Sequence, residues 1–141
     1  MEIRRLTLED DKKILTMVEE FRSYSSKLDS VRQMLEKGMN YMIACIDNEK
    51  IIGFVLGYEL QRYDGKNNMM YIHEVEILDE YRGKGIGKKI MNKLIDICQS
   101  KNMSKVFVIT NKSNTRAVHL YESTGGKALD DDSIVYWYDR L

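Results

Sequence analysis

Cysteine is scarce in this sequence, and long apolar runs are missing. The two cysteines, Cys45 and Cys98, each lie within an otherwise apolar stretch. A fold held together by disulfides is therefore disfavoured, and a reducing cytoplasm is the expected compartment. We interpret both thiols as small buried hydrophobic groups rather than nucleophiles. No run of 18 or more apolar residues occurs, so no membrane span is expected.

An excess of charge of either sign is also missing, since 22 Lys and Arg residues balance 22 Asp and Glu residues. Proteins that bind nucleic acid by neutralising phosphates are normally basic overall, so nucleic acid is not an expected partner. The His, Cys, Asp and Glu residues show no spacing typical of a metal site, and no metal is expected. Apolar residues fill 43% of the 141 positions, which is enough for the core of one domain spanning residues 1–141.

Apolar periodicity and turn residues predict an α/β chain with the order β-α-α-β-β-β-α-β-α-β, a mixed sheet with helices on both sides. The expected strands are 2–6, 41–46, 51–60, 69–78, 106–110 and 134–138. Four helices are expected. The first follows Thr7, and the second runs through 31–35 and ends at Gly38. The third extends from the glycine-rich segment to about 100, and the fourth covers 114–123. Thr7 and Asp10 have the spacing of a capping box. The residues at 47–50 predict a tight hairpin turn.

A glycine-rich segment lies directly between an expected strand and an expected amphipathic helix. It reads Arg-Gly-Lys-Gly-Ile-Gly at positions 82–87. Glycine permits positive φ and close approach of a ligand, and the free N–H groups of the following helix suit an anion. Arg82, Lys84 and Lys88 add positive charge. The spacing fits neither a P-loop nor a Rossmann fingerprint; the alternative is a turn that merely joins the strand to the helix.

Two motifs resemble those of the GCN5-related N-acetyltransferases, the GNAT superfamily. Arg82, Gly85 and Gly87 match its Arg/Gln-x-x-Gly-x-Gly/Ala motif. Residues 114–125 match its Asn-x-x-Ala-x-x-Leu-Tyr-x-x-x-Gly pattern. The order of elements agrees as well, so the resemblance covers essentially the whole chain. Within the superfamily, short segments near 71–74 and 135–139 resemble most the aminoglycoside 3-N-acetyltransferases.

This resemblance implies a GNAT-type fold in which strand 69–78 splays from strand 106–110. Acetyl-coenzyme A is then the implied cosubstrate, with its pyrophosphate on the loop amides and its pantetheine along the exposed strand edge. The residues implied to bind it are Val75, Ile77, Arg82, Gly83, Lys84, Gly85, Ile86, Gly87, Lys88 and Asn114.

The implied reaction is direct attack of an amine on the thioester in a ternary complex. A lysine-like amine must first lose a proton, which at pH 7 costs about 4.6 kcal/mol. Glu74 and Glu76 alternate on the strand and are expected on one face, with Glu74 the first choice as general base and Glu76 the second. The alternative is that they are solvated or paired with Lys or Arg. His73 is expected on the opposite face, in a structural role. Tyr121 matches the family tyrosine that protonates the departing thiolate; otherwise it is a core aromatic.

The acceptor is expected to be a small-molecule or peptide amine. An aminoglycoside amine comes first, which would link the protein to antibiotic resistance. The alternatives are a polyamine or small amine, a protein amine, and a different class: a non-catalytic module that senses acetyl-coenzyme A. The aromatic residues Tyr136, Trp137 and Tyr138 fit either burial in the sheet or a homodimer contact.

Overall fold

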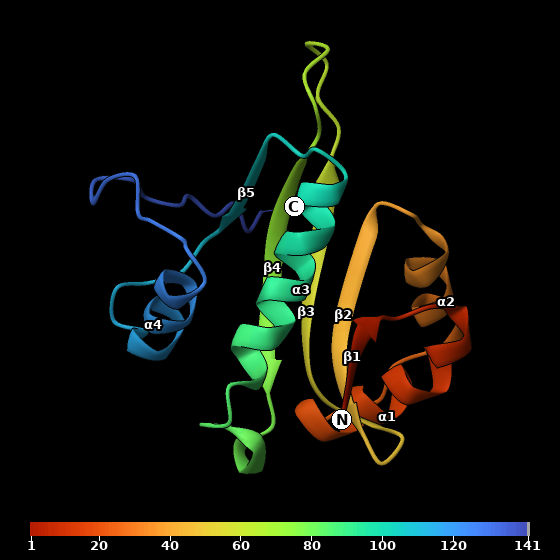
Figure 1. Ribbon diagram of the computed structural model, residues 1–141. Helices are drawn as coiled ribbons and strands as arrows, with labels where there is room; N and C mark the ends of the chain where they lie inside the picture. The colour runs from red at the N-terminus through yellow and green to blue at the C-terminus, as the bar shows by residue number, and fades with distance from the viewer. Residues whose placement is uncertain (141) are drawn as a thin grey trace.

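A five-stranded mixed sheet organises the computed structural model, which describes residues 1–140. The strand order is β1-β2-β3-β4-β5, antiparallel except for the parallel β4–β5 pair (Figure 1). The strands are β1 (Glu2–Arg5), β2 (Asn40–Asp47), β3 (Lys50–Leu60), β4 (Met69–Ile77) and β5 (Lys105–Val108). The helices are α1 (Asp11–Phe21), α2 (Leu28–Glu36), α3 (Ile86–Ser100) and α4 (Thr115–Ser123), with short 3-10 turns η1 (Leu8–Asp10) and η2 (Asp79–Tyr81). The expected mixed α/β architecture is confirmed.

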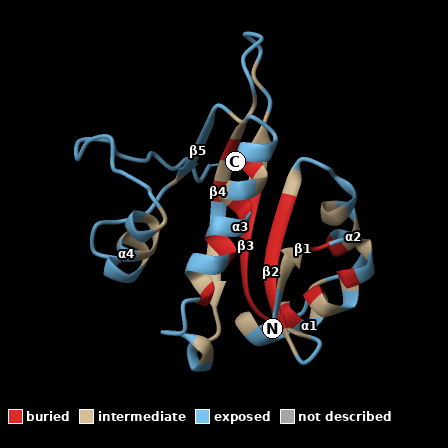
Figure 2. Cartoon of the chain, viewed as in Figure 1, coloured by how far each residue is buried: buried red, intermediate tan, exposed pale blue. Residues whose placement is uncertain are grey.

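Each face of the sheet carries its own hydrophobic core. Ile90 and Leu94 of α3 are fully buried against one face, one helical turn apart. Ile14 of α1 and Val31 of α2 are buried against the other face, around Phe54 of β3. Figure 2 shows this as buried segments along β2 and β3 and on the sides of the helices that face them. Within residues 1–140, no helix has both the length and the apolar character needed to cross a membrane.

The connection between β1 and α1 is fixed by the capping box that the sequence predicts. The Thr7 hydroxyl accepts a hydrogen bond from the N–H of Glu9 at 3.3 Å, and Asp10 Oδ2 accepts one from the N–H of Thr7 at 2.7 Å. Asp10 is only 2% exposed and also accepts two hydrogen bonds from Arg4, at 2.8 and 2.7 Å. A fork of this kind suits a carboxylate, and it ties β1 to the start of α1.

The expected hairpin is also present. Asn48 and Glu49 both adopt positive φ, 49° and 65°, between β2 and β3. Two such residues in a row form the tight turn whose twist matches that of paired strands.

The expected strand at 134–138 is absent from the described structure. Tyr136, Trp137 and Tyr138 are 75%, 87% and 71% exposed, and β5 is the outermost strand of the sheet. A segment rich in β-forming residues becomes a strand only when its backbone pairs with another strand, and within residues 1–140 this segment pairs with none. Other differences are at element ends: β5 covers 105–108 instead of 106–110, and α2 stops at Glu36, two residues before Gly38.

A one-residue bulge interrupts β4. Leu56 of β3 pairs with Glu74, whereas the next residue, Gly57, pairs with Ile72, so His73 is the extra residue. A bulge shifts the alternation of side chains by one position. The core residues 70 and 72 before it, and 75 and 77 after it, all pack with α3. The expectation that His73 lies opposite Glu74 is therefore wrong: His73 Nε2 is 3.8 Å from Glu74 Oε1.

Candidate active site

The glycine-rich loop follows η2 and leads into α3. Gly83 and Gly85 both have φ of +77°, a conformation that side chains with a Cβ rarely adopt. Gly85 is the N-cap of α3 and has no side chain to cap the helix. The first N–H groups of α3 therefore keep no partner within the helix, and together with the positive end of the helix dipole they suit an anion.

The three cations of this loop differ in what they contact. Arg82 Nη1 lies 2.9 Å from Asp79 Oδ1. Lys84 Nζ lies over the ring of Tyr81, 5.2 Å from its centroid. Lys88, in the first turn of α3, lines the adjoining cavity. The loop thus keeps positive charge beside the free N–H groups of the helix.

β4 and β5 separate in the way that the resemblance implies. Their parallel pairing ends at Ile72 and Val108, while β4 continues to Ile77. Beyond this point β4 pairs with β3 alone, from Glu74 to Ile77. The other edge of β4 therefore offers its backbone groups to a ligand, in the manner of an added strand.

A cavity of about 890 Å³ lies between this bare edge, the glycine-rich loop and α4. Its lining includes every residue expected to bind acetyl-coenzyme A except Lys84, and it also includes Glu76 and Tyr121. Those expected residues are Val75, Ile77, Arg82, Gly83, Gly85, Ile86, Gly87, Lys88 and Asn114. Residues separated by more than 40 positions in the sequence thus share one cavity.

Two of these residues also contact α4. Asn114 Oδ1 accepts a hydrogen bond from the N–H of Ala117 at 3.1 Å and so caps α4, which leaves the amide NH₂ group for a ligand. Gly87 lies where α3 meets α4, and a Cβ placed on it would make an ordinary van der Waals contact with Leu120 Cδ1, at 3.4 Å.

Tyr121 lies on α4, half-buried beside the core formed with α3. Burial raises the pKa of its hydroxyl above the ordinary value, because the phenolate form is poorly solvated there. The group therefore stays protonated at neutral pH, and Tyr121 is part of the cavity lining.

Glu74 and Glu76 are brought together by an arginine that the sequence analysis did not identify. Arg22 Nη1 donates to Glu76 Oε1 at 2.9 Å, and Arg22 Nη2 donates to Glu74 Oε2 at 3.2 Å. A further hydrogen bond joins Arg22 Nη2 to Glu76 Oε2. Both carboxylates therefore face the same side of β4, as expected, and both are paired with Arg, the alternative that the sequence left open.

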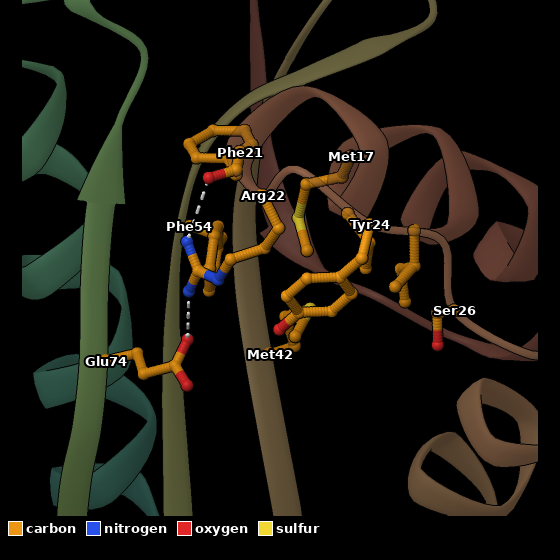
Figure 3. A pocket seen from close by; sticks show the side chains of 10 residues that line it. Met17, Phe21, Arg22, Tyr24, Ser26, Met42, Phe54 and Glu74 are labelled. Carbon is orange, nitrogen blue, oxygen red and sulfur yellow. Dashed lines mark hydrogen bonds and ion pairs between the residues drawn. The ribbon is translucent and has the colours of Figure 1, made fainter.

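Glu74 borders a second, smaller cavity of about 220 Å³ between α1, the segment after it and the sheet (Figure 3). Arg22 and Glu74 are its charged lining residues. The remaining walls are mostly apolar and come from Ile14, Met17, Val18, Phe21, Tyr24, Ser26, Met42 and Phe54. Glu76 lines the larger cavity, so the Arg22–Glu74–Glu76 cluster lies between the two.

Several other residues of the larger cavity were also missed: Tyr81, Ser113, Thr115, Arg116, His119 and Ser123. The position of Thr115 and Arg116 directly after Asn114, at the start of a helix, was an available signal. Arg22 gave no such signal, because it lies 52 residues before Glu74. Among the residues that the structure describes, no cluster of three or more His, Cys, Asp or Glu could hold a metal ion.

The comparison with family models matches residues 5–126 to the acetyltransferase (GNAT) family. This chain belongs to that family. The expectation of a GNAT acetyltransferase, and with it of an acyltransferase enzyme, is confirmed. The match covers the glycine-rich loop, β4 and α4, so it contains the larger cavity.

Two relatives match most of the length of this acetyltransferase. It is 27% identical over 136 residues to a thialysine N-epsilon-acetyltransferase of Sus scrofa, covering 84% of this chain and 79% of that one. It is 30% identical over 135 residues to an uncharacterized N-acetyltransferase of Archaeoglobus fulgidus, covering 87% and 90%. The match to the thialysine N-epsilon-acetyltransferase of Bos taurus spans about half of that protein, 47%.

Its fold matches that of an aminoglycoside acetyltransferase, meta-AAC0020, from an uncultured soil metagenomic sample. The TM-score is 0.87 at 23% identity, covering 99% of this chain and 95% of that one. At this identity the likeness establishes the fold.

Proposed function

We propose that this acetyltransferase transfers the acetyl group of acetyl-coenzyme A to a primary amine by direct attack in a ternary complex, within one domain covering residues 1–141. The observation that carries the proposal is the larger cavity. It joins the bare edge of β4, the positive-φ glycine loop and Tyr121, and Glu76 also lines it.

The cavity fits the proposed cosubstrate. A Cβ placed on Gly83 or Gly85 would meet no atom within 4 Å, so the backbone there stands open to a ligand. Free N–H groups of α3 with Arg82 and Lys88 suit a diphosphate, and the unpaired edge beside Val75 suits an extended amide chain. When bound, acetyl-coenzyme A supplies the acetyl group as an activated thioester.

The proton movements are assigned to three side chains. Glu74 accepts the proton of the acceptor ammonium, and Glu76 is the second candidate for that task. Tyr121, which lines the larger cavity, donates a proton to the departing sulfur. The residues Glu74 and Tyr121 lie at different cavities, so base and acid approach the reacting centre from different sides.

For the acceptor, we propose an aminoglycoside amine first, which would make the enzyme one that inactivates such antibiotics. Its support is the resemblance of the short segments near 71–74 and 135–139. A small aliphatic amine or polyamine is the second candidate, and protein amines are the third. The second candidate is favoured by the apolar walls of the cavity beside Glu74, which suit an alkyl chain, and by similarity to a thialysine N-epsilon-acetyltransferase.

The deciding experiment measures release of coenzyme A thiol with aminoglycosides, polyamines, thialysine and a peptide with a free N-terminus. We expect release with at least one amine class, and a saturable melting shift with acetyl-coenzyme A alone. A melting shift without thiol release from any amine would support the sensor alternative. Absence of any saturable binding of acetyl-coenzyme A would overturn the proposal.

Compartment and assembly are further proposals. Cys45 and Cys98 are both free thiols and buried, which fits a reducing cytoplasm. A homodimer through residues 134–138 is supported by the exposure of Tyr136, Trp137 and Tyr138. Light scattering coupled to size-exclusion chromatography tests this assembly, and a monomer at micromolar concentration would contradict it.

A further inference from the structure

One arginine links the two carboxylates of β4. Arg22, the first residue after α1, meets Glu76 through two hydrogen bonds and Glu74 through one, at 3.2 Å. Two parallel hydrogen bonds to one carboxylate make a stronger and better oriented contact than a single bond. Glu76 is therefore held firmly, while Glu74 keeps most of its capacity to accept hydrogen bonds.

We infer that Arg22 is a positioning residue for acetyl transfer. It fixes Glu76 and aims Glu74 at the boundary between the two cavities. The inference rests on the proposed function and extends it to a residue outside both family motifs. Arg22 itself contacts the carboxylates and not the larger cavity.

Stability does not account for this arrangement. The side chains of Arg22, Glu74 and Glu76 are 30%, 34% and 35% exposed. Ion pairs at this exposure are screened by water and contribute little to folding. Two like charges side by side repel each other, in contrast, and a cation that donates to both offsets this repulsion and fixes their orientation. The cluster is therefore better explained by positioning of the carboxylates.

The other titratable groups nearby cannot replace Arg22. His73 of β4 has its Nε2 3.8 Å from Glu74 Oε1 and carries charge only when protonated. Tyr58 of β3 has a raised pKa, first because it is buried and then because of the Glu74 charge, so it remains neutral. Tyr24, after α1, acts on Arg22 only through its charge when ionised. Arg22 is thus the permanent cation among the groups described around the pair.

The net charge of the Arg22–Glu74–Glu76 cluster also indicates which acceptor fits it. Two carboxylates and one guanidinium leave one net negative charge, which complements a single ammonium group. Both Nη atoms of Arg22 already donate to Glu74 or Glu76, so they are not free for an acceptor carboxylate. The site therefore favours a cationic amine without a carboxylate beside it, and α-amino groups of free amino acids are disfavoured.

The test compares Arg22→Gln and Arg22→Lys with the wild type. Arg32→Gln serves as matched control, because Arg32 of α2 forms a similar ion pair with Asp11 of α1, 2.7 Å away, apart from β4. The readouts are kcat/KM for the amine, the KM for acetyl-coenzyme A, and the NMR signals of the Glu74 and Glu76 carboxyl carbons at pH 7.

In Arg22→Gln, we expect kcat/KM for the amine to fall about tenfold or more, with the KM for acetyl-coenzyme A unchanged, because Glu74 and Glu76 lose the donor that orients them. The carboxyl carbon signals of both residues should change for the same reason. Arg22→Lys should restore part of the rate but not all of it, since lysine lacks the planar fork. Arg32→Gln should resemble the wild type throughout.

Two results would overturn the inference: a value of kcat/KM in Arg22→Gln that matches the wild type, or carboxyl carbon signals of Glu74 and Glu76 that change no more than in Arg32→Gln. The NMR readout does not depend on turnover. If the wild type acetylates no amine but these signals change in Arg22→Gln and not in Arg32→Gln, the proposed function fails while the positioning by Arg22 stands as a property of the pair.

Discussion

His73 Nε2 lies 3.8 Å from Glu74 Oε1, although the two residues are consecutive on a β-strand. Consecutive side chains of a regular strand point to opposite faces, so this contact is a product of the bulge in β4. The same bulge turns Glu74 and Glu76 toward the side on which Arg22 and α1 lie. One extra residue thus decides on which face of the sheet the carboxylates act.

Glu74→Gln keeps the size of the side chain but removes its ability to take a proton. We expect kcat to fall about 100-fold or more, with little change in the affinity for acetyl-coenzyme A, since Glu74 does not line the larger cavity. Glu76→Gln should lower kcat less. Steady-state kinetics of both variants, with the exposed α1 variant Glu19→Gln as control, make the comparison. Wild-type kcat in Glu74→Gln would remove this residue as the base.

Tyr121→Phe removes one hydroxyl and keeps the aromatic ring. Because the buried hydroxyl is the proposed proton donor, we expect kcat to fall about tenfold or more and the dissociation constant for acetyl-coenzyme A to change by less than about twofold. Calorimetry and turnover measurements separate the two effects. Tyr63→Phe, at a fully exposed residue, is the control. An unchanged kcat would mean that Tyr121 is only a core aromatic.

Gly85→Ala tests the glycine-rich loop, and Gly65→Ala is its matched control. Gly85 and Gly65 share a φ of +77°, and at both a Cβ would meet no atom within 4 Å. Each Ala variant should therefore lose a similar ~1 kcal/mol of stability through backbone strain. Only Gly85→Ala should weaken binding of acetyl-coenzyme A, because Gly65 lies outside the cavity. Equal affinities of the two variants would separate the loop from cosubstrate binding.

Asp10→Asn tests the ion pair that joins β1 to α1. The hydrogen bonds from Arg4 are the largest cause of the lowered pKa of Asp10. A carboxyl with a lowered pKa in the folded state stabilises the protein above its unfolded pKa, about 3.9, and this contribution is lost as pH falls through the folded pKa. We expect the variant to lose about 3 kcal/mol at pH 7.

Below pH 4 the difference between the wild type and Asp10→Asn should shrink, because acid then protonates Asp10 in the wild type as well. Urea unfolding at pH 7 and pH 3 measures both values. A difference in unfolding free energy that stays constant over this range would contradict the assignment.

Local patterns were sufficient for much of this structure. The capping box at Thr7 and Asp10, the turn at 47–50 and the glycine loop are each encoded within a few residues, because short-range hydrogen bonds and φ preferences determine them. These features depend little on distant parts of the chain. The element order from β1 to α4 and the residues around the larger cavity followed from such patterns together with the resemblance.

Three features could not be predicted, because they depend on contacts between residues that are distant in the sequence. Arg22 meets Glu74 across 52 positions, and nothing near Arg22 in the sequence marks it. The bulge at His73 arises from the register with β3, which alternation within β4 cannot reveal. The segment 134–138 has the composition of a strand, but its conformation depends on whether a partner edge is available.

The two walls of the larger cavity are anchored very differently. On one side, β4 and α3 belong to a buried core; on the other, β5 pairs along four residues and α4 contributes no buried residue. Amide hydrogens of β5 and α4 should therefore exchange with deuterated solvent well before those of β2 and β3. Such local opening lets a bulky ligand enter and leave without any melting of the molecule as a whole.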